Sequence, residues 1–580
     1  MVEKSIDRSR DRSQAVSQLN SNEQLKAGSR YLRGSISEGL EDRSTRAVSH
    51  DDTLLMKFHG IYMQDDRDQR AERQRRKLEP NHQFMVRLRL PGGIASTGQW
   101  LGLDALARRF AERGLRITTR QTIQLHGIRK PQLRACMQAI RDIGLDTIAA
   151  CGDDSRGVIC GFNPSSANVQ REVASLARQT SQLLIPKTGA YREIWYGENP
   201  PYREQNEDPH YGETYLPRKF KVGYALPPSN DIDVYGQDLG FIAIADGDDL
   251  QGFNVVVGGG MGQLDTRDDS YPRLAELIGY VAAERAPDLA LTIMGIQRDY
   301  GDRVDRHRAR FKYTLDRLGM DNFNALLQER WGEALAPAKP YHFTHNGDRP
   351  GWQQDSEGLW HATLNIANGR VDGALQDQLQ GFAQSFPGYI KLTTNQNLIL
   401  AGIEPDLVET VQWRLDDLGL LPRLSATLQS AYSMACVALP TCGLAMAESE
   451  RIMPELLQRF ESTKARHGLD EVPITLRITG CPNGCARPYI AEIALTGRAP
   501  GLYNLYLGGG FHGERLNRLH ASNVSIDQCF ALIEPLLARF AAERNGSEHF
   551  GDFLLRSGLT TAIKHGSDPQ RMIPVVEDKP

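Results

Sequence analysis

Four cysteines in the last third of the chain form two close pairs whose spacing suits a metal centre. Cys436 and Cys442 give the pattern C-x5-C, and Cys481 and Cys485 give C-x3-C after a gap of 38 residues. Structural zinc usually takes its ligands from pairs separated by two to four residues, and C-x5-C lies outside that range. A cubane iron–sulfur cluster is wider than one ion and also takes four thiolates. The set therefore predicts an iron–sulfur site of unusual spacing.

Two other uses of cysteine remain open, disulfide bonding and burial as inert thiols. The N-terminal segment M-V-E-K-S-I-D-R-S-R is charged throughout and lacks the apolar core of a secretory signal. Eight cysteines in 580 residues are too sparse for a secreted disulfide scaffold, which favours reduced thiols in the cytoplasm. Inert burial is the expectation for the other four cysteines, which are Cys136, Cys151, Cys160 and Cys529.

Cations are concentrated at strand spacing in the first half of the chain. Residues i, i+2 and i+4 of a strand share a face, so a single strand over 116–126 would carry one polar row of Arg116, Thr118, Arg120, Thr122, Gln124 and His126. Arg87 and Arg89 repeat the pattern, as do Lys219 and Lys221, and Arg156 lies just before Cys160. Alternating charges on one strand commonly face solvent. Three such strands favour a polyanionic ligand, either a cofactor with many carboxylates or a small oxyanion.

The bulk composition is that of an ordinary globular protein of roughly three or four domains. Of the 580 residues, 40% are hydrophobic and 24% are charged. The net charge of −4 predicts no general affinity for nucleic acid or for an acidic membrane. The charge-free stretch 424–447 contains Pro440, Gly443 and two of the four paired cysteines. We therefore expect it to line a buried cofactor and not to cross a bilayer.

The two halves of the chain repeat each other at three places in the same order. T-T-R-Q-T-I-Q-L-H-G (118–127) matches T-T-N-Q-N-L-I-L-A-G (393–402), and G-V-I-C-G-F-N-P (157–164) matches S-M-A-C-V-A-L-P (433–440). F-N-V-V-V-G-G-G (253–260) matches Y-N-L-Y-L-G-G-G (503–510). Helical periodicity over 100–113 and 132–143 interleaves with strand alternation over 84–90, 116–126 and 241–245. We predict an α+β fold with a pseudo-twofold duplicated unit of mixed sheets and helices.

Several longer motifs resemble the siroheme-dependent sulfite and nitrite reductases. They are Y-L-R-G (31–34), K-F-H-G-I-Y-M-Q-D-D-R-D (57–68), R-L-P-G-G (89–93), Y-L-P-R-K-F-K (215–221), N-D-I-D (230–233) and both cysteine motifs. R-A-E-R followed by K-L-E-P (70–80) favours the hemoprotein (beta) subunits of NADPH-dependent assimilatory sulfite reductases over the ferredoxin-dependent enzymes. The resemblance covers nearly the whole chain and implies ferredoxin-like repeats around a central cofactor site.

The resemblance implies a role for each candidate site residue. A [4Fe–4S] cluster would be held by Cys436, Cys442, Cys481 and Cys485, and Cys485 would also bridge to the siroheme iron. Sulfite would be surrounded by Arg87, Arg156, Lys219 and Lys221. The siroheme and its carboxylates would be contacted by Arg116, Arg120, Gln124, Gln396 and Asn483. The chain departs from the family at Gly152, where an asparagine is common.

The implied reaction is the six-electron reduction of sulfite to sulfide, a step of assimilatory sulfate reduction and cysteine biosynthesis. The sequence shows no convincing flavin or nicotinamide motif. Electrons would therefore come from a flavoprotein (alpha) subunit that carries FAD and FMN and oxidises NADPH. The nearest alternatives are an assimilatory nitrite reductase and a ferredoxin-dependent sulfite reductase. Alternatives of other classes are a non-catalytic iron–sulfur electron-transfer protein and a structural zinc protein.

We expect four regions along the chain. Residues 1–80 form a polar, charged extension and a candidate docking element for the partner subunit. Residues 81–148 together with 349–424 form the pair of ferredoxin-like repeats. Residues 149–348 form the first-half domain for the cofactor and anion, and 425–580 form the second-half iron–sulfur and siroheme domain. In this division the first half supplies most of the cations and the second half supplies the metal ligands.

Overall fold

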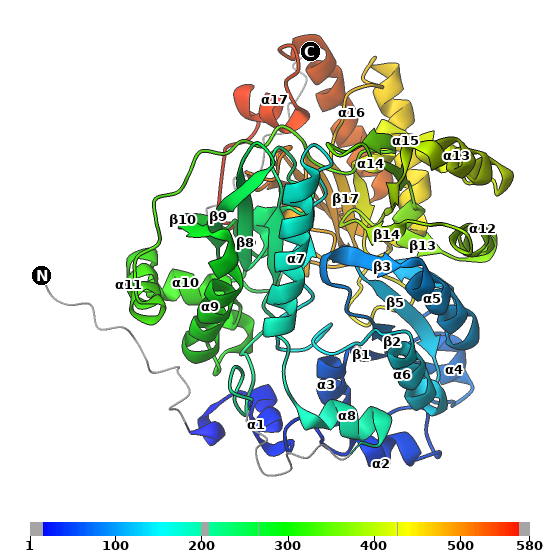
Figure 1. The fold of residues 1–580 in the computed structure, drawn as a ribbon, viewed down its shortest axis with the longest axis vertical. Helices are drawn as coiled ribbons and strands as arrows, with labels where there is room; N and C mark the ends of the chain where they lie inside the picture. Colours follow the sequence, from blue (N-terminus) through cyan, green and yellow to red (C-terminus); the bar gives the residue numbers. More distant parts are fainter. Residues whose placement is uncertain (1–14, 199–207, 265, 426, 568–580) are drawn as a thin grey trace, which may run out of the picture.

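The sheets of the protein occur as two matching pairs. A computed structural model describes residues 15–198, 208–264, 266–425 and 427–567, and within them it has four sheets of five strands each. Figure 1 shows the chain passing from α1–α3 at the foot of the molecule to α16 and α17 at the top. Within the described ranges, every helix is too short or too polar to pass through a bilayer.

The first pair of sheets is antiparallel throughout. Each sheet takes one strand from the other half of the chain, and the two are called the strand-exchanged sheets. Their strand orders are β1-β2-β5-β4-β13 and β11-β12-β15-β14-β3. Strand β13 comes from the second half of the chain but completes the first sheet, and β3 does the reverse. The bounds are β1 Ile61–Asp65, β2 His82–Arg87, β3 Ile94–Ser96, β4 Leu115–Ile117, β5 Ile123–Ile128, β11 Gly351–Gln354, β12 Trp360–Leu364, β13 Arg370–Val371, β14 Tyr389–Leu392 and β15 Leu398–Ile403.

The second pair of sheets is mixed. The strand orders are β10-β9-β8-β7-β6 and β16-β17-β18-β19-β20. Counted from β6 in the first sheet and from β16 in the second, each has two parallel pairings followed by two antiparallel ones. The bounds are β6 Ile159–Cys160, β7 Val222–Ala225, β8 Leu239–Asp246, β9 Asp249–Val257, β10 Glu276–Ala282, β16 Ser433–Ala435, β17 Leu476–Thr479, β18 Ile493–Ala499, β19 Leu502–Leu507 and β20 Arg518–Val524. Each half of the chain thus forms most of one antiparallel sheet and all of one mixed sheet, and this repetition confirms the predicted duplicated α+β fold.

Helices pack on the sheets, and some of their contacts join the two halves of the chain. α5 packs against α6 and α12, and α7 packs against α9. One hydrophobic core runs through both strand-exchanged sheets and the β6–β10 sheet, and a second core lies in the β16–β20 sheet. The bounds are α1 Ser21–Gly28, α2 Ile36–Glu41, α3 His50–Leu55, α4 Arg70–Arg75, α5 Thr97–Phe110, α6 Leu133–Asp142, α7 Ala167–Leu183, α8 Gly189–Tyr196, α9 Ala286–Tyr300, α10 Phe311–Leu318, α11 Met320–Trp331, α12 Gly373–Ala383, α13 Val408–Asp417, α14 Leu428–Ala431, α15 Met453–Arg466, α16 Ile526–Glu543 and α17 Phe550–Arg556.

The predicted single strand over 116–126 is wrong, because this segment is a hairpin. β4 ends at Ile117, and T-T-R-Q forms the turn into β5, with Gln121 at φ 52°. The Thr118 hydroxyl accepts a hydrogen bond from the Arg120 backbone N–H at 3.2 Å, a local bond that favours a turn over a strand. Arg116 and Gln124 consequently face each other across the hairpin, and Arg120 lies in the turn.

The beginning of the described chain is anchored to the body of the protein, although we expected residues 1–80 to form an extension. On α1, Glu23 is fully buried and Lys26 is 2% exposed. The Lys26 ammonium donates to Glu23 at 2.5 Å and to the Leu216 carbonyl at 2.8 Å. Arg303 forms a second ion pair with Glu23, so one buried carboxylate serves two cations. The predicted docking role of this region stays a prediction.

Replacing Glu23 with glutamine is expected to destabilise the fold by about 3–5 kcal/mol, because it removes the nearest carboxylate of two buried cations and leaves Lys26 with Asp153 at 3.7 Å. Thermal or denaturant unfolding of the purified chain measures this. Glu72→Gln is the matched control, since Glu72 pairs with Arg75 on the exposed helix α4 and such pairs contribute about 0–1 kcal/mol. Equal unfolding midpoints for both variants would contradict the anchoring role.

Candidate metal centre and anion site

The four paired cysteines lie at one edge of the β16–β20 sheet. Cys436 directly follows β16, and Cys481 comes two residues after β17 ends. β16 and β17 are parallel neighbours, so their carboxyl ends meet at the same edge. The Gly480 N–H donates to the Cys436 sulfur at 3.3 Å, which joins the two loops directly. The sheet topology thus brings together two cysteine pairs that are separated by 38 residues in sequence.

The four thiols are close enough to shift one another's pKa values, and Cys485 contributes to the shift of each of the other three. Burial, and then the neighbouring Cys485, raises the pKa of Cys436 and of Cys481 to about 12. The pKa of Cys442 is raised for the same two reasons. Cys485 is exposed, whereas Cys481 is buried. In the described part of the chain, no three His, Cys, Asp or Glu side chains converge closely enough to hold a single ion.

Segments from the first half enclose the cysteine loops. The Arg67 backbone N–H donates to the Pro440 carbonyl at 3.2 Å, and its guanidinium donates to the Ala445 carbonyl at 2.5 Å. The Gln263 N–H donates to the Pro482 carbonyl at 3.1 Å, so the glycine-rich segment after β9 lies on the C-P-N-G-C loop. A metal centre at these loops would be held by the second half and covered by the first.

Three cations form a row across the first strand-exchanged sheet. Arg87 on β2 pairs in register with Gln124 on β5, which pairs with Arg116 on β4, which pairs with Arg370 on β13. Glu450 neutralises part of this row, with contacts of 2.8 Å to Arg116 and 2.9 Å to Arg370. The predicted residues Arg87, Arg116 and Gln124 thus share one row, although they come from three strands.

The other side of the site is formed by a cluster of cationic side chains, the basic group, which consists of Arg87, Arg120, Arg156, Lys219 and Lys221. The Arg156 guanidinium donates to the carbonyls of Ala150 and Gly152 at 3.2 and 2.8 Å. Burial, and then the charges of Arg310 and Arg120, lowers the pKa of Lys221 to about 7. Burial, and then Lys221, lowers the pKa of Lys219 well below its ordinary value.

The basic group is short of negative charge and adjoins the thiols. Removal from water, and then the charge of Arg156, lowers the pKa of Arg120 to about 9. The Nε atoms of Arg120 and Arg156 are buried without a hydrogen-bond partner. Cys485 is close enough to raise the pKa of Lys221, and its carbonyl accepts from the Thr119 hydroxyl at 3.0 Å. These observations fit a bound group with several carboxylates beside Cys485.

Gln396 and Asn483 have local partners. The Gln396 amide nitrogen donates to the Asn368 carbonyl at 3.2 Å and to the Ile117 carbonyl at 3.5 Å, which leaves its oxygen as the acceptor. The Asn483 amide donates to the Cys481 sulfur at 3.5 Å. Both residues lie in the loops that bound the site.

Three residues of the site were not predicted from the sequence, and they are Tyr62, Cys151 and Arg487. The Arg87 guanidinium lies 3.0 Å from the Cys151 sulfur and 5.8 Å from the centre of the Tyr62 ring. Burial, and then Cys151, raises the pKa of Tyr62. Cys151 is therefore in the basic group, and a lone cysteine carries no spacing signal that could show this. Tyr62 does lie inside the K-F-H-G-I-Y motif, which was the available clue.

Arg487 connects the two hairpin turns that the repeat produces. Its guanidinium donates to the Thr119 carbonyl at 3.0 Å and to the Thr394 carbonyl at 3.4 Å, and it forms an ion pair with Asp233. Arg477 pairs with the same Asp233 at 2.7 Å. The N-D-I-D motif therefore supplies the carboxylate that orients both arginines.

The departure at Gly152 has a steric explanation. Gly152 has φ 102°, and a Cβ atom there would lie 2.9 Å from the Asp154 carboxylate and 3.0 Å from the Phe58 Cα. Its carbonyl is also a hydrogen-bond acceptor for Arg156. The local backbone therefore favours glycine at this position.

Gly152→Asn is expected to lower both stability and turnover. A non-glycine residue in such a conformation costs about 1–3 kcal/mol, and the shift of the 152 carbonyl would release Arg156. Unfolding midpoints and turnover of the purified variant measure the two effects. Gly157→Ala is the control, because a Cβ at Gly157 meets nothing within 4 Å. An unchanged Gly152→Asn protein would contradict the steric argument.

Comparison with known proteins agrees with this architecture. The family model for the nitrite and sulfite reductase ferredoxin-like half domain matches residues 75–143 and 353–418, and the model for the nitrite and sulphite reductase 4Fe-4S domain matches 177–335. The latter stretch lies in the first half, before all four paired cysteines. In fold, the chain is similar to the structure of the Mycobacterium tuberculosis NirA protein, with a TM-score of 0.74 over 93% of this chain and 96% of that one at 24% identity.

Curated relatives match over almost their entire length. The sulfite reductase [NADPH] hemoprotein beta-component of Nitrobacter hamburgensis is 53% identical, covering 97% of this chain and 98% of the relative. Proteins of the same name from Afipia carboxidovorans and Staphylococcus haemolyticus are 52% and 49% identical, covering 97% and 95% of this chain and 98% and 97% of the relatives. With this identity over this length, the chain belongs to the nitrite and sulfite reductase family.

Proposed function

We propose that this chain is the hemoprotein subunit of an assimilatory, NADPH-dependent sulfite reductase, with a siroheme and a [4Fe–4S] cluster as its cofactors. The observation that carries the proposal is the position of Cys485. Its thiol is close enough to raise the pKa of each of the other three cysteines and also that of Lys221 in the basic group. A residue so placed can join a cluster on one side to a cofactor on the other. The names of the curated relatives support the same assignment.

The protein side chains would divide into two sets around the cofactors. The cluster would be held by Cys436, Cys442, Cys481 and Cys485, and the siroheme and its carboxylates by Arg116, Arg120, Gln124, Gln396 and Asn483. When bound, these groups supply the iron that holds the substrate and the electrons that reduce it. Because Arg116 already pairs with Glu450, its share of cofactor binding would be the smallest of the set.

The basic group would bind sulfite and deliver protons. Arg87 and Arg156 have guanidinium groups, which can each donate two hydrogen bonds to an oxyanion. Arg156 is oriented by the carbonyls of Ala150 and Gly152, so its position is fixed before an anion arrives. Lys219 and Lys221 have lowered pKa values, and that of Lys221 is about 7. Such ammonium groups give up protons readily at neutral pH, as the departure of each sulfite oxygen as water requires.

The test is spectroscopic first and catalytic second. The absorption spectrum of the purified protein should show siroheme and iron–sulfur bands, and sulfite should perturb the siroheme bands. An artificial reductant should then support the formation of sulfide from sulfite at six electrons per product. Iron–sulfur bands without siroheme would instead indicate an electron-transfer protein. Zinc without iron in metal analysis would also overturn the proposal.

Nitrite is the alternative substrate, because it is also a small anion that needs six electrons. Turnover with each anion under one reductant distinguishes the two. A kcat/KM for nitrite well above that for sulfite would reassign the chain as a nitrite reductase.

The electron donor would be a flavoprotein alpha subunit that carries FAD and FMN and uses NADPH. The word "beta-component" in the names of the relatives supports a second subunit. We place the enzyme in the cytoplasm, where its eight free thiols would stay reduced. Copurification of a flavoprotein, and NADPH-dependent sulfite reduction by the pair but not by either alone, tests the partner.

A further inference from the structure

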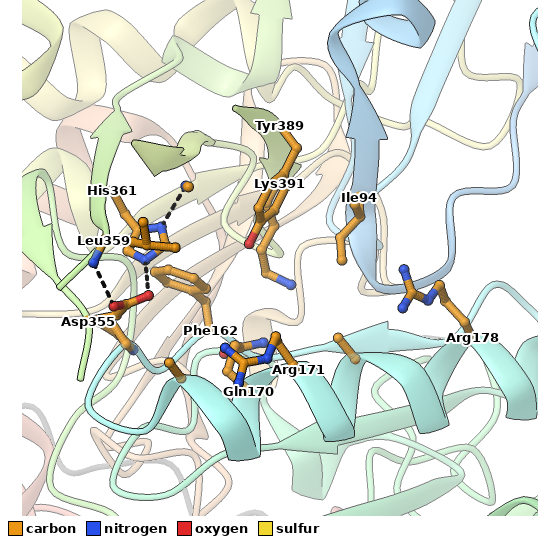
Figure 2. A pocket seen from close by; sticks show the side chains of 14 residues that line it. Ile94, Phe162, Gln170, Arg171, Arg178, Asp355, Leu359, His361, Tyr389 and Lys391 are labelled. Carbon is orange, nitrogen blue, oxygen red and sulfur yellow. Dashed lines mark hydrogen bonds and ion pairs between the residues drawn. The ribbon is translucent and has the colours of Figure 1, made fainter. Parts of the chain in front are cut away.

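A cavity away from the cofactor site lies between helix α7 and the second strand-exchanged sheet. Its volume is about 340 Å³, which is within the range of small-molecule sites. Figure 2 shows α7 along one side, with Lys391 and Tyr389 reaching in from the strand above and Phe162 and His361 beside them. The walls are mainly apolar, and the cations that line it are Arg171, Arg178 and Lys391.

The repeat shows what is missing in this cavity. Lys391 stands two residues before T-T-N-Q, as Arg116 stands two residues before T-T-R-Q in the first half. Both are buried, at 1% and 4% exposure, and both pair with the exchanged strand of their sheet. Arg116 has the carboxylate of Glu450 at 2.8 Å. Lys391 has two carbonyl oxygens as its hydrogen-bond partners, Gly92 at 3.0 Å and Cys160 at 3.5 Å.

The charges around the cavity leave a cationic surplus. Among the described residues, neither Lys391 nor Arg178 has a carboxylate within ion-pair distance, and Arg171 pairs with Glu357. Lys391 is close enough to Asp231 to favour its charged form, but burial has the larger effect and raises the pKa of Asp231 to about 7. Asp231 is therefore only partly ionised at neutral pH. An ammonium group has three donors, and two carbonyls leave one of the three on Lys391 for an anion.

The histidine of the cavity is already engaged. The Gly402 N–H donates to His361 Nδ1 at 3.3 Å, so Nε2 carries the proton and donates to Asp355 at 3.1 Å. Both ring nitrogens are therefore occupied, and burial lowers the pKa of His361. The pair forms a fixed polar wall and offers no free base. The cavity accordingly has the features of a binding site and not those of a catalytic one.

We propose that this cavity binds a small organic carboxylate with an apolar body. The carboxylate would occupy the place by Lys391 that Glu450 fills in the other half, with Arg178 as the second cation. The apolar body would lie on Phe162 and Tyr389, above the small side chains Ala167 and Ala174 of α7. An inorganic anion would leave this apolar surface wet, and a neutral molecule would leave the cations without a partner.

The probe for the test is 4-fluorobenzoate, observed by fluorine NMR with the purified holoenzyme. We expect binding with a Kd on the order of 1 mM, as for a ligand of few atoms, and much weaker binding of 4-fluorobenzamide. Ala174→Leu fills the cavity without altering its charge, and Arg178→Gln removes an exposed cation. Each should weaken binding by about tenfold. Arg109→Gln, an exposed arginine on α5, is the control and should change nothing.

Lys219→Met separates this cavity from the basic group of the cofactor site, and it should leave 4-fluorobenzoate binding unchanged. Loss of binding in Lys219→Met, with retention in Ala174→Leu, would place the probe in the cofactor site and overturn the proposal. Equal binding of the carboxylate and the amide would overturn it as well, as would equal competition by inorganic sulfate. The readout is binding alone, so its outcome is independent of sulfite turnover.

Discussion

Replacing Cys485 with serine is expected to abolish sulfite reduction and to uncouple the two cofactors. Cys485 is the exposed thiol of the four, and it adjoins both the other cysteines and Lys221. A serine hydroxyl is a far poorer donor to iron than a thiolate. Iron content should fall, the siroheme bands should shift or vanish, and turnover should drop to background. Absorption and electron paramagnetic resonance spectra, with iron analysis, measure these changes.

The matched control is Cys160→Ser, because Cys160 stands in the first half where Cys436 stands in the second. Cys160 is fully buried, and its thiol already donates to the Gly161 carbonyl at 3.4 Å, so a hydroxyl has an acceptor there. This variant should retain both cofactors and most of the turnover. If Cys485→Ser kept a normal spectrum and normal turnover, the bridging role would be wrong.

Lys219→Met is expected to keep the cofactor spectrum and to lose about 10²–10³ in turnover, the usual cost of removing one charged group that stabilises a transition state. Lys219 is surrounded by other cations, and burial lowers its pKa well below the ordinary value. Removing it should relieve repulsion among the cations, so the fold should tolerate the change. Steady-state kinetics and sulfite titration of the siroheme bands separate turnover from cofactor loading.

Lys187→Met serves as the control for Lys219→Met, because Lys187 is an exposed lysine of the same half. Its kinetics should equal those of the unmodified protein. A Lys219→Met protein with normal turnover would remove the division between a metal-binding half and an anion-binding half.

The sequence was most informative where residues near one another in the chain act together. The three matched segments predicted the duplication, and the two cysteine pairs predicted a shared metal centre. The structure adds the sheet edge where the pairs meet, because each pair follows a strand of one parallel pairing. The error at 116–126 arose because alternation continues through T-T-R-Q, whereas the turn there is closed by the Thr118 hydroxyl bond and by backbone bonds of Thr118 with Gln121 and Thr122. Arg116 and Gln124, which were predicted to share a face of one strand, are instead in-register partners across the hairpin, and Arg87 pairs with Gln124 from β2.

Other features depend on long-range contacts that no local pattern records. Cys151 joins the basic group through Arg87, which is 64 residues away. Glu450 reaches Arg116 across 334 residues, and a lone glutamate before a helix gives no sign of such a partner. β13 has two residues and β3 has three, too few for any periodicity.

The exchange of β3 and β13 also bears on how such a chain could have arisen. A protein of half this length would have a four-stranded sheet with an open edge, and an open edge seeks another strand. A second copy could supply it, each lending the strand that the other lacks, as in domain-swapped dimers. Joining the two copies end to end would preserve that reciprocity while freeing each copy to change separately. The present asymmetry, with thiols in one half and cations in the other, is then what a fused homodimer becomes once its two sites need no longer be the same.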